Sequence, residues 1–187
     1  GGLGSCTDVS GQRSFADIFD AYAAARPGLF WPPSVRRDAA AALPTLGDIR
    51  GRVVVAVLHG PGGGPVARYG LADFAGWDDG SSTYVQDEYN VPNVGAIATK
   101  RDQVRRFLDA TSAGDRSRMY VNFTSGSSVF AHPQHVAGGA FGVQGVNPFL
   151  LTYLRQGPEV HTPVTRTGAV LLDFPGGALI DRIIDTN

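Results

Sequence analysis

The stretch Gly168–Gly177 constrains the fold most strongly, because an apolar run within it ends at a carboxylate just before a Pro-Gly-Gly turn. Four apolar residues follow one another in Ala169–Leu172 without polar alternation, which predicts a strand buried on both faces. After the turn, helical spacing places four apolar residues on one face: Leu179, Ile180, Ile183 and Ile184. The stretch therefore predicts one βα unit, with Asp173 at the carboxyl end of its strand.

Three more apolar runs have the length and the β-branched or aromatic content of short strands. They are Val53–Leu58, Thr83–Gln86 and Met119–Thr124. Helix patterns separate the four runs, so we expect parallel strands that are neighbours in chain order and joined by right-handed crossovers. The predicted fold class is α/β, built from parallel β/α units.

The amino-terminal part of the chain predicts helices rather than strands. Residues 1–13 are rich in small polar residues without any period, and we expect a loop or ragged end there. Residues 14–26 form an amphipathic pattern in which Ser14 and Asp17 predict a capping box. A shorter helix pattern covers Val35–Leu43.

Two more helices are expected before that βα unit. Pro92 opens a long pattern whose basic residues are expected to face solvent, opposite the apolar positions. These basic residues are Lys100, Arg101, Arg105 and Arg106. Asn147 and Pro148 predict the cap and the first residue of a helix over 149–155.

Composition limits the classes of protein that this chain can represent. With 187 residues, 43% of them hydrophobic, the chain has the size of one globular domain. A net charge of -1 without a basic cluster argues against nucleic acid as a partner. The single cysteine, Cys6, excludes an internal disulfide and a cysteine-based metal site. No initiator Met or signal peptide opens the sequence, so we expect a processed or truncated product.

Two carboxylates at predicted strand ends are the first functional candidates. Asp87 follows the run Thr83–Gln86 in the position that Asp173 has in its own unit. Ligands of α/β sheets and barrels are met at the carboxyl ends of strands. The alternative for Asp173 is structural, a carboxylate that caps the turn amides of Gly176 and Gly177.

Three other patterns are less persuasive. The loop Gly60–Pro65 lacks the Gly-Lys-Ser/Thr ending of a phosphate-binding loop, so a surface loop is the better interpretation. His132 and His135 are three residues apart, but Pro133 argues against the helix that would pair them around a metal. A glycosylation sequon begins at Asn122 but lies within a predicted core strand, and we discount it.

Five motifs follow one another in a specific order along the chain. They are Leu46–Val55, Val85–Tyr89, Tyr120–Ser125, Val146–Pro148 and Val170–Gly177. In order and spacing they resemble the bacterial-type phosphatidylinositol-specific phospholipases C, the X-domain family. The resemblance covers residues 42–187.

This resemblance implies a TIM-like irregular barrel, of which the chain matches the carboxyl-terminal half, about four strands. We therefore expect residues 1–187 to form a single partial domain. Family members are phosphodiesterases that cleave phosphatidylinositol to diacylglycerol and inositol cyclic phosphate, with one histidine as base and another as acid. Both histidines belong to the half that this chain lacks, so we expect the isolated chain to be inactive.

The resemblance also assigns roles to individual residues. Asp173 looks like the carboxylate that orients the base histidine, which is not in this chain. Asp87 and Tyr89 look like the substrate-binding pair, the first accepting hydrogen bonds from inositol hydroxyls and the second stacking on the ring. Where family members place an inositol-binding arginine, this chain has Leu58–His59. Arg68 is the expected substitute.

A lipid-surface rim, partners and a location are implied in the same way. Trp77, Val129 and Phe130 occupy loops that touch the lipid surface in the family, with ordinary loop packing as the alternative. The implied partners are the phosphatidylinositol headgroup, a membrane surface bound peripherally, and the missing half or a second copy. No cofactor or metal is expected in this chain, and calcium use by a full enzyme stays open. The family implies a secreted, extracellular protein.

The sequence leaves two interpretations other than a phospholipase C domain. The main alternative is a non-catalytic inositol- or lipid-headgroup-binding module that keeps Asp87 and Tyr89 as a polyol site. An unrelated α/β hydrolase is disfavoured, because the sequence has no Gly-x-Ser-x-Gly elbow.

Overall fold

The computed structural model describes residues 9–32, 43–55, 80–81 and 83–187, and the chain divides into two compact units. The first unit is Gly1–Gly76 and the second is Trp77–Asn187. Predictions that fall on 33–42 and 56–79 lie outside the described residues, including most of the expected helix Val35–Leu43.

The first unit contains helix α1, Phe15–Ala24, close to the expected 14–26. Its predicted capping box is confirmed: the Asp17 amide donates to the Ser14 hydroxyl over 3.1 Å, and the Ser14 amide donates to the Asp17 carboxylate over 3.3 Å. Val53 makes an isolated parallel bridge with Phe30. The end of the predicted strand Val53–Leu58 lies outside the described residues.

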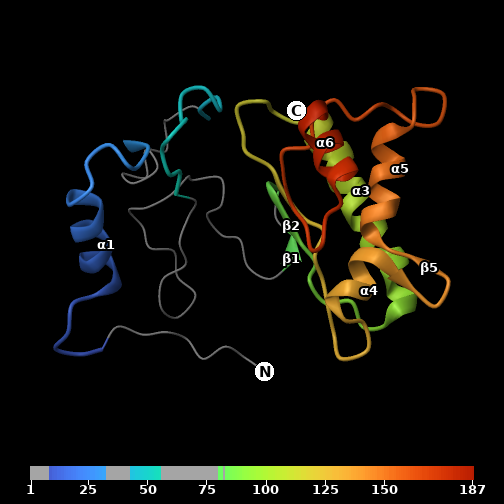
Figure 1. Cartoon of the computed structure of the whole chain (residues 1–187), viewed down its shortest axis with the longest axis horizontal. Helices are drawn as coiled ribbons and strands as arrows, with labels where there is room; N and C mark the ends of the chain where they lie inside the picture. Colours follow the sequence, from blue (N-terminus) through green and yellow to red (C-terminus); the bar gives the residue numbers. More distant parts are fainter. Residues whose placement is uncertain (1–8, 33–42, 56–79, 82) are drawn as a thin grey trace. The chain divides into compact units, whose positions relative to one another are not determined.

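The second unit is an α/β layer structure whose elements follow in chain order (Figure 1). They are β1 (Gly80–Ser81), β2 (Val85–Asp87), the 3₁₀ turn η2 (Val94–Ala96), α3 (Ile97–Ala113), β3 (Val121–Phe123), α4 (Pro133–Gly138), β4 (Gly139–Ala140), β5 (Val143–Gln144), α5 (Val146–Arg155), β6 (Ala169–Leu171) and α6 (Gly177–Thr186).

The main sheet has the order β1-β2-β3-β6. Strands β2, β3 and β6 are parallel neighbours in chain order, which confirms three of the four predicted strands. The antiparallel strand β1 pairs with β2 on the side away from β3. The predicted fourth strand, Val53–Leu58, lies in the first unit and largely outside the described residues. A second, two-stranded sheet joins β4 and β5.

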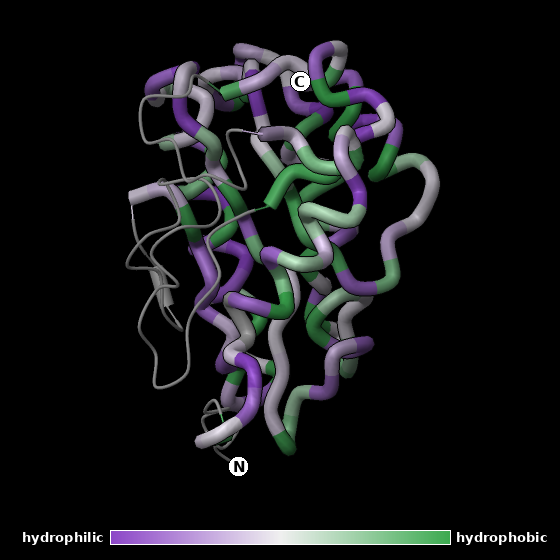
Figure 2. The backbone as a smooth tube through the Cα atoms, turned by 90° about the vertical axis from the view of Figure 1, so that its left-hand side faces the viewer, coloured by the Kyte–Doolittle hydropathy of each residue, from purple (hydrophilic) through white to green (hydrophobic). Residues whose placement is uncertain are grey.

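Helices α3, α4, α5 and α6 lie on one side of this sheet in Figure 1, and the core fills the space between the layers. The core residues are Val91, Ile97, Val104, Leu108, Ala131, Val136, Val146, Leu150, Tyr153, Leu154, Leu179 and Ile183. Each fully buried Leu, Ile or Val side chain contributes about 1.5–3 kcal/mol to folding. The tube of Figure 2 alternates between apolar and polar residues along its length, as expected for elements with one buried face.

Strand β6 and helix α6 are more exposed than their sequence predicts. Leu171 is 42% exposed, so the expected burial of this strand on both faces is wrong. The reason is that β6 is the last strand of the sheet, and the helices lie on one side of it. In α6, Leu179 and Ile183 are buried, whereas Ile180 and Ile184 are exposed.

Three further predictions about helices are wrong. Lys100 is buried, although it was expected on the solvated face of α3. A helix, α4, does form at Pro133, because proline is well tolerated in a first helical turn. Helix α5 begins at Val146 with Gly145 as its cap, so Asn147 lies inside the helix and is not its cap.

Candidate functional site

Parallel pairing sets the position of the candidate residues. Gln86 pairs with Asn122, and Asn122 pairs with Val170, so β2, β3 and β6 end at the same edge of the sheet. Asp87 ends β2, while Ser125 and Asp173 follow β3 and β6 by two residues. These three residues therefore share the carboxyl edge of the sheet, where ligands of α/β folds are met.

The segment after β2 presents one buried carboxylate and one accessible ring. Asp87 is 8% exposed and Tyr89 is 50% exposed. The Tyr89 amide donates to the Asp87 carbonyl over 2.9 Å, which makes a tight turn around Glu88. From the loop after β3, the Ser127 hydroxyl donates to the Tyr89 hydroxyl over 3.0 Å. The Tyr89 ring is thus held at an accessible position beside Asp87.

Asp173 lies in the loop between β6 and α6, where it is partly buried. Its backbone carbonyl accepts a 2.8 Å hydrogen bond from the Asn147 side chain, which also donates to the Phe174 carbonyl over 3.2 Å. Among the described residues, no hydrogen bond joins the Asp173 carboxylate to Gly176 or Gly177. The structural alternative of a cap for these amides is therefore wrong.

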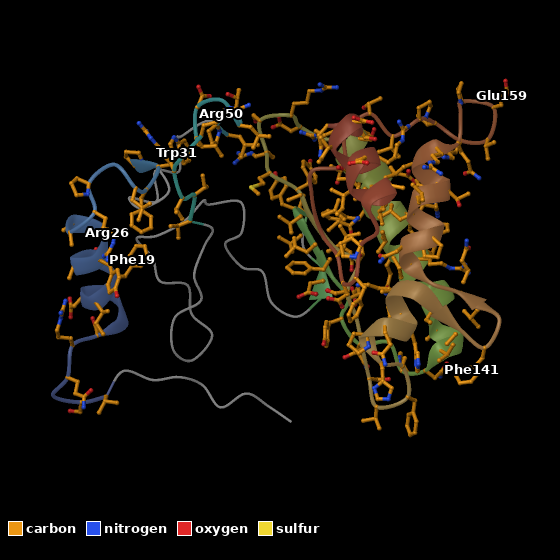
Figure 3. All side chains as sticks on the ribbon, in the orientation of Figure 1. Phe19, Arg26, Trp31, Arg50, Phe141 and Glu159 are labelled. Atoms are coloured by element: carbon orange, nitrogen blue, oxygen red, sulfur yellow. The ribbon has the colours of Figure 1, made fainter. Side chains whose placement is uncertain are left out.

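An apolar rim lies at the same edge, and we define it as Val129, Phe130, Phe141 and Phe174. Their exposed fractions are 80%, 76%, 89% and 69%. Val129 and Phe130 follow β3 and Phe174 follows β6, while Phe141 is at the tip of the β4–β5 hairpin just before α5 and projects from the molecule in Figure 3. Two of these residues were predicted; Arg68 and Trp77 lie outside the described residues.

Phe141 and Phe174 were missed, although glycines beside them give a signal. Phe141 has φ 50° and Phe174 has φ 49°, a left-handed conformation that is uncommon for a large residue. Gly142 follows the first, and Pro-Gly-Gly follows the second, so both sites read as turns. A phenylalanine in an exposed turn is a binding signal when others gather at the same edge.

The loop that carries Val129 and Phe130 is ordered by its own hydrogen bonds. The Ser128 hydroxyl accepts from the amides of Phe130 and Ala131 over 3.2 and 3.1 Å, and it donates to the Pro92 carbonyl over 3.1 Å. The exposure of the two apolar side chains is therefore built into a fixed turn.

Lys100 is the polar residue at this edge that sequence reasoning missed. Its exposed fraction is 1%, and its ammonium donates to the Glu88 carbonyl over 2.8 Å and to the Gln86 side chain over 3.2 Å. Burial lowers the pKa of Lys100 to about 8, against the attraction of Asp87 and Glu88, which raises it. The signal was its position in α3, three residues after Ile97 and four before Val104, on the apolar face.

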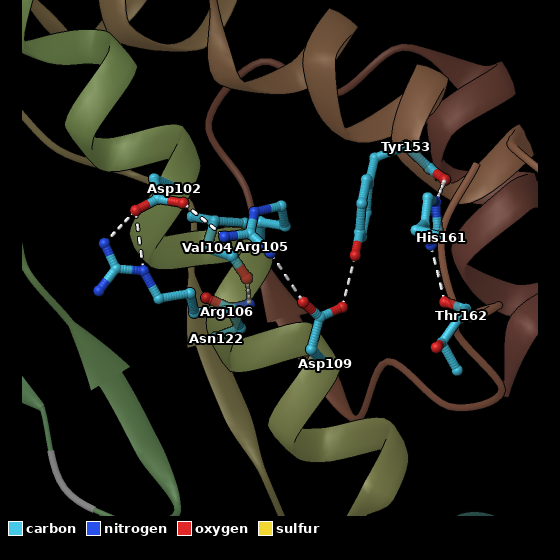
Figure 4. A network of polar contacts seen from close by, with 9 residues as sticks. All are labelled: Asp102, Val104, Arg105, Arg106, Asp109, Asn122, Tyr153, His161 and Thr162. Carbon is cyan, nitrogen blue, oxygen red and sulfur yellow. Dashed lines mark hydrogen bonds and ion pairs between the residues drawn. The ribbon is translucent and has the colours of Figure 1, made fainter.

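A second polar cluster lies farther along α3, through its middle, and is drawn in Figure 4. Arg105 pairs with Asp102 and Asp109, and the Tyr153 hydroxyl donates to Asp109 over 2.5 Å. His161 stacks on the Tyr153 ring with centroids 4.1 Å apart. Burial and the hydrogen bond to Asp109 raise the pKa of Tyr153 to about 12.

These groups border a cavity of about 760 Å³ between α3, α5 and the loop that leads to β6. The cavity is therefore at the amino edge of the sheet, away from Asp87 and Asp173. Arg105, Asp109 and Tyr153 bind one another there, so the cluster connects α3 to α5. We interpret it as structural.

In the described part of the chain, no three His, Cys, Asp or Glu side chains gather as metal ligands. Nor does any described helix have the length and apolar character needed to cross a bilayer. A scan against protein-family models and a search of curated proteins both find no match to this chain.

Proposed function

We propose that this chain is part of a phosphodiesterase of the phosphatidylinositol-specific phospholipase C type, and that it supplies the headgroup site and part of the membrane-facing rim. The observation that carries the proposal is the grouping of Asp87, Tyr89 and Asp173 at one sheet edge beside four exposed apolar residues. In this proposal the parallel strands β2, β3 and β6 belong to a larger TIM-like barrel.

The polar groups suit a cyclic polyol. The Asp87 carboxylate accepts hydrogen bonds only, so it matches ring hydroxyl donors, and such charge-assisted bonds are stronger than neutral ones. The half-exposed Tyr89 ring offers an apolar face to the axial C–H side of an inositol. Arg68, predicted to bind the inositol as well, belongs to the same proposal.

The chemistry itself requires groups beyond this chain. We assign Asp173 the role of orienting a base histidine that another part of the barrel supplies. Of the three described histidines, His161 binds two backbone carbonyls at the amino edge, while His132 and His135 lie in the segment after β3 with their rings against each other. Without an acid and a base, each typically worth about 10² to 10⁴-fold, turnover by the chain alone would be very slow.

The second candidate is a headgroup-binding module without catalysis. It is favoured by the same distribution of histidines, because Asp87 and Tyr89 need no acid or base to bind a polyol. One experiment separates the two candidates: a polypeptide that carries the two histidines of the missing half is added to this chain. The enzyme candidate then releases inositol cyclic phosphate from phosphatidylinositol, and the binding module does not. We expect release that Asp173→Asn reduces at least about tenfold, in line with loss of an orienting carboxylate. Turnover by the chain alone, abolished by changing His135, would contradict the assignment.

Membrane binding is tested with vesicles of phosphatidylcholine, with and without phosphatidylinositol. Replacing Phe130 or Phe141 by Ser should reduce the bound fraction on both vesicles, by about tenfold in partition coefficient for each inserted ring. Asp87→Asn should remove only the preference for phosphatidylinositol. Ile184→Ser is the matched control, because Ile184 is 67% exposed but lies at the far end of α6. Equal losses in all variants would refute the rim.

A further inference from the structure

The buried amine of Lys100 is chemically singular in this chain. The sequence has sixteen Lys and Arg residues, and Lys100 is the one lysine among them. It projects from the first turn of α3 toward the end of β2 with 1% of its surface exposed. Burying an ammonium costs several kcal/mol unless its hydrogen bonds are satisfied, and an apolar side chain of that length would avoid the cost.

Lys100 is one corner of a network that joins three elements. The Gln86 amide nitrogen donates to the Asn122 side chain over 2.6 Å and to the Phe123 carbonyl over 2.9 Å. Asn122 in turn donates to the Val104 carbonyl of α3 over 3.0 Å. The network therefore fixes the Gln86 side chain between β2, β3 and α3.

The effect of this network falls on the turn that carries the proposed polyol site. The Gln86 oxygen accepts both the Glu88 amide, over 2.7 Å, and the Lys100 ammonium. The ammonium also donates to the Glu88 carbonyl, so Gln86 of β2 binds the amide of Glu88 and Lys100 of α3 binds its carbonyl. On the other side, the Tyr89 carbonyl accepts the Ser127 amide over 3.0 Å. Glu88 lies directly between Asp87 and Tyr89.

The charged groups that face Lys100 are carboxylates, whose attraction opposes the lowering of its pKa by burial. Asp87 and Glu88 at the end of β2 attract the ammonium. On the side of β3 and α3, the groups linked to Lys100 through Gln86 are uncharged. Gln86 donates to the Asn122 side chain, and Asn122 donates to the Val104 carbonyl. A neighbouring cavity of about 270 Å³ is lined, apart from Lys100, by uncharged residues: Asn90, Val91, Pro92, Ala96, Thr99 and Gln103.

We propose that Lys100 is a positioning residue for Asp87 and Tyr89, holding the turn between them so that carboxylate and ring meet one polyol. The inference rests on the proposed function for its ligand. Its structural half, the fixing of the Glu88 turn by the ammonium, stands on the contacts alone.

The test compares the wild-type chain with Lys100→Met and with Arg106→Met. Arg106 is on the same helix, is exposed and pairs with Asp102, so it controls for loss of a positive charge from α3. The probe is myo-inositol, with binding followed by NMR. We expect Lys100→Met to weaken binding at least about tenfold and Arg106→Met to leave it within about twofold. Amide exchange at Glu88 and Tyr89 should rise only in Lys100→Met.

The wild-type protein supplies a readout that needs no variant. Because the chain has one lysine, ¹⁵N-lysine labelling gives a single side-chain signal. The chemical shift of this signal should change when myo-inositol binds. The affinity for inositol should fall between pH 7 and pH 9, and the midpoint of that fall should coincide with the midpoint of the Lys100 titration. A purely structural lysine would show neither response.

The outcomes separate the two ideas. Inositol binding by the wild type that is equally strong in Lys100→Met overturns the inference and leaves the proposed function in place. No binding by the wild type overturns the proposed headgroup site. Unchanged amide exchange at Glu88 and Tyr89 in Lys100→Met overturns the inference whether or not inositol binds.

Discussion

The buried lysine makes stability depend on pH in a direction that can be derived from its pKa. The pKa of Lys100 is about 8 in the folded chain, and its ordinary value is 10.5. Between these values the unfolded chain binds more protons than the folded one, so the free energy of unfolding rises as the pH rises. Below about pH 7 both states hold the proton, and Lys100 adds no slope there.

The magnitude follows from integrating this difference in proton binding. From pH 8 to pH 10 the folded state gains about 2 kcal/mol relative to the unfolded state through Lys100 alone. A methionine at position 100 does not titrate. We therefore expect the free energy of unfolding of the wild type, minus that of Lys100→Met, to rise by about 2 kcal/mol over this interval.

Urea unfolding followed by far-ultraviolet circular dichroism, at steps from pH 6 to pH 10, measures this difference. The subtraction removes other groups that titrate in the same range. Arg106→Met should show no change relative to the wild type across the interval, because arginine stays charged. A constant difference between wild type and Lys100→Met from pH 8 to pH 10 would mean that Lys100 titrates near its ordinary pKa, and the argument from burial would be refuted.

Three further predictions concern other parts of the fold. Gly168→Ala should lower the free energy of unfolding by at least about 2 kcal/mol, because Gly168 has φ 65° and an added Cβ would lie 2.5 Å from the Tyr120 carbonyl oxygen. Urea unfolding measures this loss. Gly157→Ala is the neutral control, because an added Cβ there meets nothing within 4 Å. In an alkaline absorbance titration, Tyr153→Phe should remove the tyrosine transition near pH 12. If the variant instead lost a transition at lower pH, the raised pKa of Tyr153 would be contradicted. Ser14→Ala should cost helix α1 about 1 kcal/mol, seen as reduced helical dichroism.

Local signals were sufficient where the interaction is local. The capping box joins Ser14 to Asp17 within one helical turn, and the sequence contains everything it needs. The three parallel strands were predictable because a crossover helix between apolar runs allows few arrangements. Their parallel order then placed Asp87 and Asp173 at one edge without knowledge of any side-chain contact.

The misses share a cause, which is a partner distant in sequence. Lys100 fits the periodicity of the apolar face of α3, but its acceptors are 14 residues away on β2 and 12 residues away in the turn just after β2. Asn147 looks like a cap, yet its side chain binds the Asp173 carbonyl 26 residues on. The exposure of Leu171 depends on which elements cover the second face of the sheet, and an apolar run carries no information about that.

Asn122 has a consequence for how such a chain could mature. Its side chain is fully buried and donates to the Val104 carbonyl, yet Asn122-Phe-Thr124 is a sequon for N-linked glycans. A sugar on that nitrogen needs space where α3 packs on β3, so glycan attachment and folding exclude one another at this residue. In a compartment where nascent chains are glycosylated, the yield of native protein would depend on whether α3 packs on β3 before the transferase reaches Asn122.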